Sequence, residues 1–559
     1  MSNLLARPSF PLCVLVCALF AGASAFAAPP LPDKSRMIAH RGDSIEAPEN
    51  TLEAFRRAFA DGFGAELDLY LSLDGEVFLT HDRNADVMNR KYGLDHASTN
   101  ICWKGELDGA DAGGWRGKAW KGTPFARLDD VLAIAPADVK LVFDIKDPRQ
   151  EIAPLIRAAV DRHPQVKDEN IICLGGKCKR LFPKSPALYC TIEKRTWAKD
   201  APLVPREELL EKLRKMKLDG LSIRWNREVV TADFIKFFND AGYPVHVWTV
   251  NLPEDVQLAF ERGAASVTSD SPRRIFTLWD EAFSEPPAKE KGALRMMVFN
   301  IWGPFFGNPV AEREDGVAAT ILREDPDVVA LQETTPEWWA SGLFGKLTDE
   351  YGVVEGGWER ANRHHNPNPL LYRKSRMEVV ASGRSLFHWK LDYSKGYTWA
   401  IFREKATGAC FTAFSTHFWW QENGKESDTI RLWDAEQLVQ GLDRVRRIQP
   451  VPVIGGGDFN AKLGSDALSY LFDRGFADAQ QVAKTASSVT SWHDYPVRDW
   501  QGRYRGFVPR ANVAADQSLD HVIANAGIEV LRHRVVRHPV AMDVSDHSPV
   551  VVDFMLKNR

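Results

Sequence analysis

Short apolar runs alternate with amphipathic stretches through the first half of this chain, and no other feature limits its fold so strongly. The apolar runs predict strands at residues 37–39, 65–71, 140–145, 171–174, 221–223, 245–250 and 266–268. The amphipathic stretches predict helices at residues 51–60, 151–159, 207–215, 232–240 and 254–262. Strands that alternate with helices form a parallel sheet, and this pattern is typical of a closed (β/α)8, TIM-like barrel. We therefore expect residues 34–280 to form such a barrel.

A polar segment containing Pro286 and Pro287 separates this half from a second one. Because a chain of 559 residues is too long for a single hydrophobic core, we interpret residues 281–293 as an interdomain linker. Residues 294–559 show predicted strands at 295–299, 328–331, 369–372, 410–415, 452–454, 520–523 and 550–555. Fewer helices separate these strands, which favours a four-layer α/β sandwich.

The first 27 residues predict an export signal. Arg7 precedes a short apolar run at residues 12–20, and Ala25-Phe26-Ala27 is typical of a cleavage site. A membrane anchor would need about 20 apolar residues, and we find no run of that length anywhere in the chain. We therefore expect a secreted or periplasmic protein. In such a compartment Cys173 and Cys178 are close enough in sequence for a loop disulfide, although buried free thiols are an equal alternative.

Ionisable residues follow the predicted strands of the first half in a regular order. His40 and Arg41 end the first strand, and Glu66 and Asp68 alternate with apolar residues on the second. Both carboxylates therefore point to one face, where they repel each other unless a cation lies between them. His81, and the pair Asp144 and Lys146, come after later strands. Each motif alone is more often a solvated strand face or a structural histidine, whereas the ordered set indicates a functional site.

These motifs resemble the glycerophosphodiester phosphodiesterase family, whose fold is a (β/α) barrel. The likeness runs from residue 37 to residue 278 and includes His40-Arg41-Gly42, Pro48-Glu49-Asn50-Thr51, Glu66-x-Asp68, Ser72-x-Asp74-Gly75, His81-Asp82, Trp248-Thr249-Val250-Asn251 and Thr268-x-Asp270-x-Pro272.

The resemblance implies a role for each charged group of the first half. Glu66 and Asp68 would ligate a divalent metal, Ca²⁺ or Mg²⁺, and His40 and His81 would form the general acid/base pair. Arg41 and Lys146 would hold phosphate. Asp144 stands where the family usually has Glu as a third metal ligand, and its shorter side chain implies ligation through water or a different preference of ion.

Polar groups also follow the predicted strands of the second half. They are Asn300, Glu333, His417, Asp458 with Asn460, and Asp546 with His547. Asp520 begins a further strand, and a buried Asp of this kind commonly orients an imidazole and raises its basicity. Taken singly, a motif such as Gly455-Gly456-Gly457-Asp458 is more often a simple turn, and one such as Ser545-Asp546-His547 is more often an exposed loop. Acids and histidines at successive strand ends indicate a second catalytic site.

The order of these residues resembles the endonuclease/exonuclease/phosphatase family, from about residue 294 to the C-terminus. By that resemblance Glu333 binds Mg²⁺ with Asn300 and Asp546, and His547, oriented by Asp520, is the general base for water. Asp458 and Asn460 would position the water and the phosphate, and His417 matches the general acid of the nuclease and sphingomyelinase branches. The motif implies hydrolysis of a phosphoester and leaves the substrate open.

Together the two sites predict a secreted bifunctional metal-dependent phosphoesterase that acts on small molecules. The first domain would cut glycerophosphodiesters into a phosphomonoester and an alcohol. The second would hydrolyse a phosphomonoester or a phosphodiester, and sequential action of the two would suit phosphate scavenging. A binding module without activity would lack acids or histidines that this chain retains.

An alternative is that the second domain is an independent nuclease or a sphingomyelinase-like enzyme. The net charge of −4 provides no basic excess of the kind that nucleic-acid-binding domains show. A lipid phosphodiesterase would need an apolar loop, for which the pairs Trp338-Trp339 and Trp419-Trp420 are candidates. The sequence does not indicate the oligomeric state.

Overall fold

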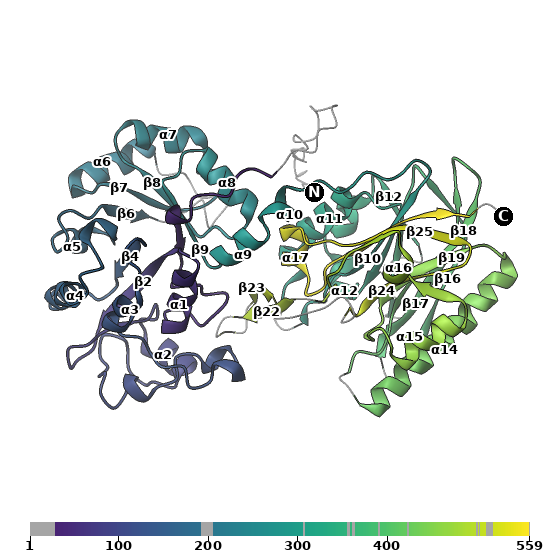
Figure 1. Cartoon of the computed structure of the whole chain (residues 1–559), viewed down its shortest axis with the longest axis horizontal. Coiled ribbons are helices and arrows are strands. Elements are labelled where there is room, and N and C mark those ends of the chain that lie inside the picture. Colours follow the sequence, from purple (N-terminus) through teal and green to yellow (C-terminus); the bar gives the residue numbers. More distant parts are fainter. Residues whose placement is uncertain are drawn as a thin grey trace, which may run out of the picture.

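A computed structural model describes most of the chain as two bodies of secondary structure that lie side by side (Figure 1). The described residues are 28–191, 205–305, 308–354, 358–359, 364–388, 392–421, 424–492, 494–498, 501, 504–509 and 518–557. The expected export signal at residues 1–27 lies outside them. Among the described residues, every helix is too short or too polar to cross a bilayer.

Parallel strands form a closed barrel in the first body, as predicted. Its eight strands are β1 (Met37–Ala39), β2 (Gly64–Leu71), β4 (Leu141–Ile145), β5 (Ile171–Leu174), β6 (Ala187–Thr191), β7 (Gly220–Arg224), β8 (Val245–Trp248) and β9 (Ser266–Ser269). Strand β1 pairs in parallel with both β2 and β9, and these two pairings close the barrel. A short strand, β3 (Val77–Leu79), pairs antiparallel with β2. The sequence analysis did not predict β6, although Ala187-Leu188-Tyr189-Cys190 is a short apolar run.

Helices surround the barrel and bury their apolar faces against it (Figure 1). The helix α1 begins after Thr51, whose side chain accepts a hydrogen bond from Ala54 N, and it buries Phe55 and Phe59. The helices of this body are α1 (Leu52–Ala60), α2 (Ala85–Tyr92), α3 (Leu128–Ile134), α4 (Ile152–Asp161), α5 (Gly176–Lys179), α6 (Arg206–Met216), α7 (Ala232–Asp240), α8 (Pro253–Glu261), α9 (Pro272–Thr277) and α10 (Trp279–Phe283).

Two mixed sheets pack face to face in the second body, which confirms the sandwich. One sheet orders β12 (Tyr351–Val354), β15 (Leu370–Arg373), β11 (Val328–Gln332), β10 (Leu294–Asn300), β26 (Val550–Leu556), β25 (Ile528–Val535) and β21 (Thr485–Ala486). The other orders β16 (Met377–His388), β17 (Asp392–Glu404), β18 (Cys410–His417), β19 (Val453–Asp458), β24 (Asp520–Asn525) and β20 (Phe476–Asp478). Side chains from both sheets share one core, including Val298, Phe402 and Phe554.

Helices form the two outer layers of the sandwich. The first sheet is covered by α11 (Glu314–Glu324), α12 (Pro336–Ala340), α13 (Leu343–Leu347) and α17 (Pro539–Val544). The second is covered by α14 (Lys425–Ile448) and α15 (Asp466–Asp473), while α16 (Ala479–Val482) lies near β24. Two further hairpins pair β13 (Trp358–Glu359) with β14 (His364–His365) and β22 (Asp494–Arg498) with β23 (Tyr504–Pro509). The layer order is therefore helix, sheet, sheet, helix.

The two bodies contact each other through charged side chains. Arg274 Nη1 lies 2.6 Å from Asp543 Oδ1, and Arg537 Nη1 lies 3.5 Å from Glu281 Oε1. Secondary structure of the barrel ends with α10 at Phe283, and β10 begins at Leu294. The expected linker at residues 281–293 thus starts inside α10.

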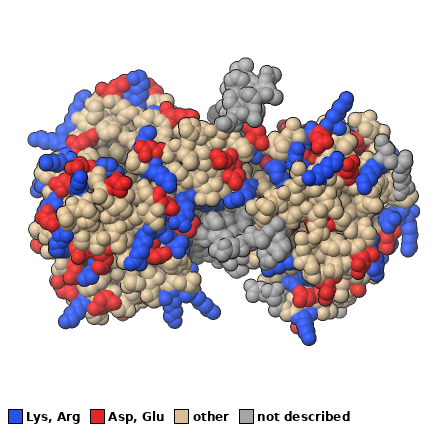
Figure 2. All heavy atoms as spheres, viewed as in Figure 1, with Lys and Arg blue, Asp and Glu red and all other residues tan. Residues whose placement is uncertain are grey.

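Surface charge is mixed in sign. Figure 2 shows Lys and Arg interspersed with Asp and Glu over both bodies on the face that it presents. Cys173 is disulfide-bonded, while Cys102, Cys190 and Cys410 are free. The side chain of Cys178, the predicted partner of Cys173, lies outside the described part of the chain.

Candidate active sites

The first site lies where the barrel strands β1, β2, β4 and β9 end. His40 directly follows β1, and Asp270 directly follows β9. Asp68 on β2 lies opposite Asp144 on β4 in the strand register. The carboxyl ends of parallel barrel strands meet on one face, which is where barrel enzymes place their catalytic groups.

Three carboxylates form the centre of this site. Oxygen atoms of Glu66, Asp68 and Asp144 lie within 4.8 Å of one another. Burial, followed by the charges of Asp68 and Asp144, raises the pKa of Glu66 well above its ordinary value. Asp68 Oδ1 is buried and accepts no hydrogen bond among the described residues, although Lys146 Nζ forms an ion pair with it at 3.3 Å. Such a cluster fits a divalent cation, which binds carboxylate oxygens and removes their mutual repulsion. Asp144 belongs to the cluster despite its shorter side chain.

Arg41 and Lys146, the predicted phosphate ligands, contact these carboxylates. Arg41 Nε lies 3.3 Å from Asp68 Oδ2, and Lys146 Nζ lies 2.6 Å from Asp144 Oδ2 and 3.3 Å from Asp68 Oδ1. Although burial opposes it, these two cations lower the pKa of Asp68 to about 2. Arg41 is held in place by Glu49, whose Oε2 accepts a hydrogen bond from Arg41 Nη1 at 2.8 Å.

The two histidines of the first site differ in their environment. His40 Nδ1 lies 2.7 Å from Asp270 Oδ1, and Asn251 Nδ2 donates to Asp270 Oδ2 at 2.9 Å. Burial and then Arg41 lower the pKa of His81 to about 4, so His81 is neutral at neutral pH and suited to accept a proton. Sequence reasoning did not assign Asp270, although this acid stood in a quoted motif. The signal was its place after the last barrel strand, which pairs with the first.

The second site lies along one row of the second sheet. His417 on β18 is opposite Asp458 on β19, and Asp458 is opposite Asp520 on β24. Asp458 Oδ1 also accepts a hydrogen bond from Asn460 N at 2.8 Å. Adjacent strands thus bring together three of the predicted catalytic side chains.

Asp520 and His547 form a buried pair, as the sequence predicted. His547 Nδ1 lies 2.7 Å from Asp520 Oδ2, and Ser491 Oγ donates to the same oxygen at 2.6 Å. Although burial opposes it, Asp520 and Asp458 raise the pKa of His547 well above its ordinary value. An imidazole held in this way has one defined orientation and leaves Nε2 for a substrate or water. Sequence reasoning missed Ser491, which precedes a short hairpin and carries no recognisable signal.

The predicted metal ligands of the second domain converge beside this pair. Asn300 Nδ2 lies 3.3 Å from Glu333 Oε1 and 3.1 Å from Asp458 Oδ2. Burial, together with the charge of Glu333, raises the pKa of Asp546 to about 6, and Asp546 Oδ1 is buried without a hydrogen-bond partner among the described residues. Asn300 turns its amide nitrogen to the carboxylates, while its Oδ1 accepts a hydrogen bond from Trp302 N at 3.0 Å. In this arrangement the carboxylates of Glu333 and Asp546 are the oxygen ligands that fit a divalent cation.

Another group that could hold a metal comprises Asp458, Asp520 and His547, whose ligand atoms lie within 4.8 Å of one another. Because Asp520 already hydrogen-bonds His547 Nδ1, a metal in this second group would break the pair. The set containing Glu333 is therefore the better candidate.

Lys395 brings a positive charge into the second site that sequence reasoning missed. Its Nζ lies 2.6 Å from His417 Nε2, and that nitrogen lies 3.4 Å from Asp458 Oδ2. Burial lowers the pKa of Lys395 from that of an ordinary lysine. Sequence analysis did not predict the strand β17 that carries Lys395, so it had no means of placing this residue.

We expect Lys395→Gln to lower kcat/KM for phosphoester hydrolysis by the second domain about a hundredfold, because it removes the positive charge that lies against His417 and close to Asp458. The protonated form is the active one, so wild-type activity should fall as pH rises through the lowered pKa of Lys395. The variant should lack this alkaline limb. Profiles of kcat/KM between about pH 6 and 10 measure both effects. Lys405→Gln is the matched control, because Lys405 is exposed and directly follows the other end of β17. An unchanged alkaline limb in Lys395→Gln would contradict the assignment.

The four tryptophans considered for lipid docking are mostly buried. Trp338 is fully buried, Trp339 stacks on Phe344, and Trp419 is only 8% exposed. Trp420 is 56% exposed and follows His417 by three residues. A docking loop, if the second domain uses one, would therefore involve Trp420 and not the earlier pair.

Comparisons with known proteins match each half separately. Residues 40–274 match the Glycerophosphoryl diester phosphodiesterase family, and residues 297–547 match the Endonuclease/Exonuclease/phosphatase family. Both families are phosphoric ester hydrolases and typically depend on divalent metals.

Relatives of the first half share about a quarter of its residues. Glycerophosphodiester phosphodiesterase domain-containing protein 5 of Homo sapiens is 24% identical over 283 residues, which are 46% of this chain and 45% of the human protein. The chain thus spans less than half the length of that relative. Uncharacterized protein YqiK of Bacillus subtilis is 27% identical over 254 residues, 44% of this chain and 98% of YqiK.

A solved structure resembles the other half. The endonuclease/exonuclease/phosphatase from Bacteroides vulgatus is 23% identical and has a TM-score of 0.37. The likeness covers 47% of this chain and 99% of that one.

Proposed function

We propose that this chain, in which a glycerophosphoryl diester phosphodiesterase family domain precedes an endonuclease/exonuclease/phosphatase family domain, is a bifunctional metal-dependent phosphoesterase. The observation that carries the proposal is the presence of two separate clusters of acids and histidines, one on each body. In each cluster burial and a neighbouring carboxylate raise the pKa of one acid, Glu66 in the first and Asp546 in the second. Their charged forms are therefore unfavourable without a cation.

The first domain would cleave glycerophosphodiesters into a phosphomonoester and an alcohol. His81, neutral because of its lowered pKa, would accept the proton of the attacking water, and His40, oriented by Asp270, would protonate the leaving alkoxide. Arg41 and Lys146 would neutralise charge on the phosphate. A divalent cation, Ca²⁺ or Mg²⁺, held by Glu66, Asp68 and Asp144 would act as a Lewis acid when bound.

The second domain would hydrolyse a phosphomonoester or a phosphodiester. His547, held by Asp520, would take the proton of the attacking water, and His417 would protonate the leaving group. Asp458, Asn460 and Lys395 would position the water and the phosphate. Asn300, Glu333 and Asp546 would hold Mg²⁺, which stabilises developing charge when bound.

We further propose that the two domains act in sequence outside the cytoplasm, converting a diester to a monoester and then to inorganic phosphate. The test is phosphate release from a glycerophosphodiester by the full chain and by two variants, Glu66→Gln and His547→Ala. Glu66→Gln should stop all release, whereas His547→Ala should accumulate the monoester. Phosphate release that neither substitution changes would exclude the relay. Recovery of the protein from culture medium or periplasm, with its N-terminus after Ala27, tests export.

The exposure of Trp420 near His417 favours a second candidate, an independent phosphodiesterase that acts on lipid headgroups. Incubation of the full chain with choline-lipid vesicles and with labelled DNA distinguishes it from the phosphatase and from a nuclease. The mixed surface charge in Figure 2 gives a nuclease no evident basic groove on that face.

A further inference from the structure

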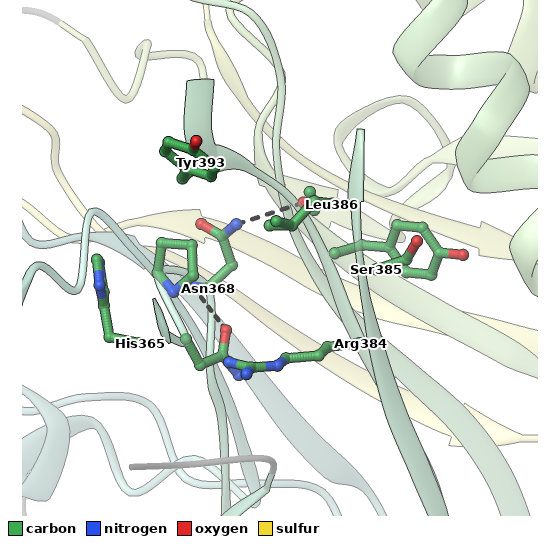
Figure 3. A pocket seen from close by; sticks show the side chains of 10 residues that line it. His365, Asn368, Arg384, Ser385, Leu386 and Tyr393 are labelled. Atoms are coloured by element: carbon green, nitrogen blue, oxygen red, sulfur yellow. Dashed lines mark hydrogen bonds between the residues drawn. The ribbon is translucent and has the colours of Figure 1, made fainter. Parts of the chain in front are cut away.

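A cavity of about 500 Å³ opens at the edge of the second sheet, and none of the roles assigned above uses it (Figure 3). Its walls are the segment 365–368 that leads into β15, the end of β16 and the beginning of β17. This volume is large enough for the organic part of a small phosphoester.

The cavity adjoins the second catalytic centre on two sides. Leu386 on β16 and Gly396 on β17 both line the cavity and lie opposite each other in the sheet. Gly396 in turn lies opposite His417 on β18. Neighbouring strands lie about 4.8 Å apart, so Leu386 is about 10 Å from His417 along this row. On the other side, Thr334, which follows the metal-ligand candidate Glu333, donates its N–H to the oxygen of Pro367 in the cavity wall at 3.0 Å. A phosphoester whose phosphorus faces His417 would therefore extend its alcohol into the cavity.

Arg384 is the charged group of this cavity. Figure 3 shows its side chain reaching from β16 across the cavity towards the segment that carries His365. Within the described part of the chain, Arg384 forms no ion pair with an acid, and it is exposed. An unpaired guanidinium in a concave site is a binding group for phosphate or carboxylate.

Asn368 supplies a complementary polar contact. Its amide nitrogen donates to Ser394 O at 3.0 Å, which fixes the amide orientation. The amide oxygen is buried without a hydrogen-bond partner among the described residues, and in Figure 3 it points between His365 and Tyr393. A hydroxyl group of a ligand would satisfy this acceptor. The exposed ring of Tyr393 forms a wall against which a carbon skeleton can pack.

We propose that this cavity binds the alcohol part of the second domain's substrate, and that this alcohol is a polyol or sugar carrying a second anionic group that Arg384 binds. The proposal rests on the phosphoesterase function proposed for the second domain. It names the substrate class that the motif leaves open, namely a hydroxylated phosphoester with two anionic groups.

The test uses the full chain carrying Glu66→Gln, so that the first domain is silent, with 4-nitrophenyl phosphate as the reporter substrate. Inhibition constants are compared for glucitol 1,6-bisphosphate and glucitol 6-phosphate, which differ in one phosphate. We expect the bisphosphate to inhibit at least tenfold more tightly, since a charge-assisted hydrogen bond contributes about that factor. Arg384→Gln should bring the two constants to within about twofold and leave turnover of the reporter unchanged.

Arg403→Gln is the matched control, because Arg403 lies on the same β16–β17 ribbon and pairs with Glu378 at 3.0 Å. It should leave the tenfold ratio intact. Equal inhibition by both compounds in the unsubstituted cavity, or a ratio that Arg384→Gln does not change, would overturn the inference while the phosphoesterase function stands. Reporter hydrolysis that His547→Ala does not reduce would instead overturn the function itself.

Discussion

His547→Ala is expected to lower phosphoester hydrolysis by the second domain about a thousandfold, within the range that general acid–base groups contribute. His547 is fixed at Nδ1 by Asp520, and its Nε2 lies 3.9 Å from Asp458 Oδ2. It lies between α17 and β26 and belongs to no strand, so the substitution removes the base without changing a strand residue. The measurement is kcat and KM with 4-nitrophenyl phosphate. Cleavage of a glycerophosphodiester by the barrel of the same molecule is the internal control and should not change.

Asp520→Asn separates a positioning role from a catalytic one. Asp520 touches His547 and Ser491 and not the expected substrate position, so the substitution should lower kcat and leave KM nearly constant. A His547→Ala protein that keeps more than a tenth of the wild-type rate would show that another group acts as the base.

Glu66→Gln and Asp68→Asn are both expected to reduce glycerophosphodiester cleavage by at least a thousandfold, because each removes a ligand of the expected cation. Their effects on stability in EDTA should have opposite signs. Glu66 is destabilised by burial and by two neighbouring carboxylates, so its neutralisation should raise the Tm of the metal-free protein. Asp68 is stabilised by Arg41 and Lys146, so Asp68→Asn should lower the Tm.

The expected size is about 2–4 °C in each direction, the change that about 1 kcal/mol produces in a domain of this size. For Asp68 the sign follows from its lowered pKa. The charged form of Asp68 stabilises the fold at any pH above the pKa of a free carboxyl, and this contribution is lost as the pH falls towards 2. Glu53→Gln, which removes one partner of a partly exposed ion pair with Arg57, is the control and should change the Tm little. Equal shifts for both site variants would contradict the electrostatic picture of the cluster.

Several features could be derived from the sequence because they depend on neighbours along the chain. The alternation of acids and apolar residues at Glu66 and Asp68 places both carboxylates on one face of any strand. The periodic apolar runs predicted the barrel and the sandwich. Each of these follows from the repeat of a strand or helix, which is local.

Other features arose only when distant segments packed together. Asp270 reaches His40 across 230 residues because β9 pairs with β1 and closes the barrel. Lys395 reaches His417, and Arg384 reaches the adjoining cavity, because β16, β17 and β18 share one register. The residue types and spacings along the chain thus determined which chemistry is available. Strand register and sheet closure depend on packing between residues far apart in sequence. They decided which side chains orient the catalytic groups, which bring charge into the sites and which line the adjoining cavity.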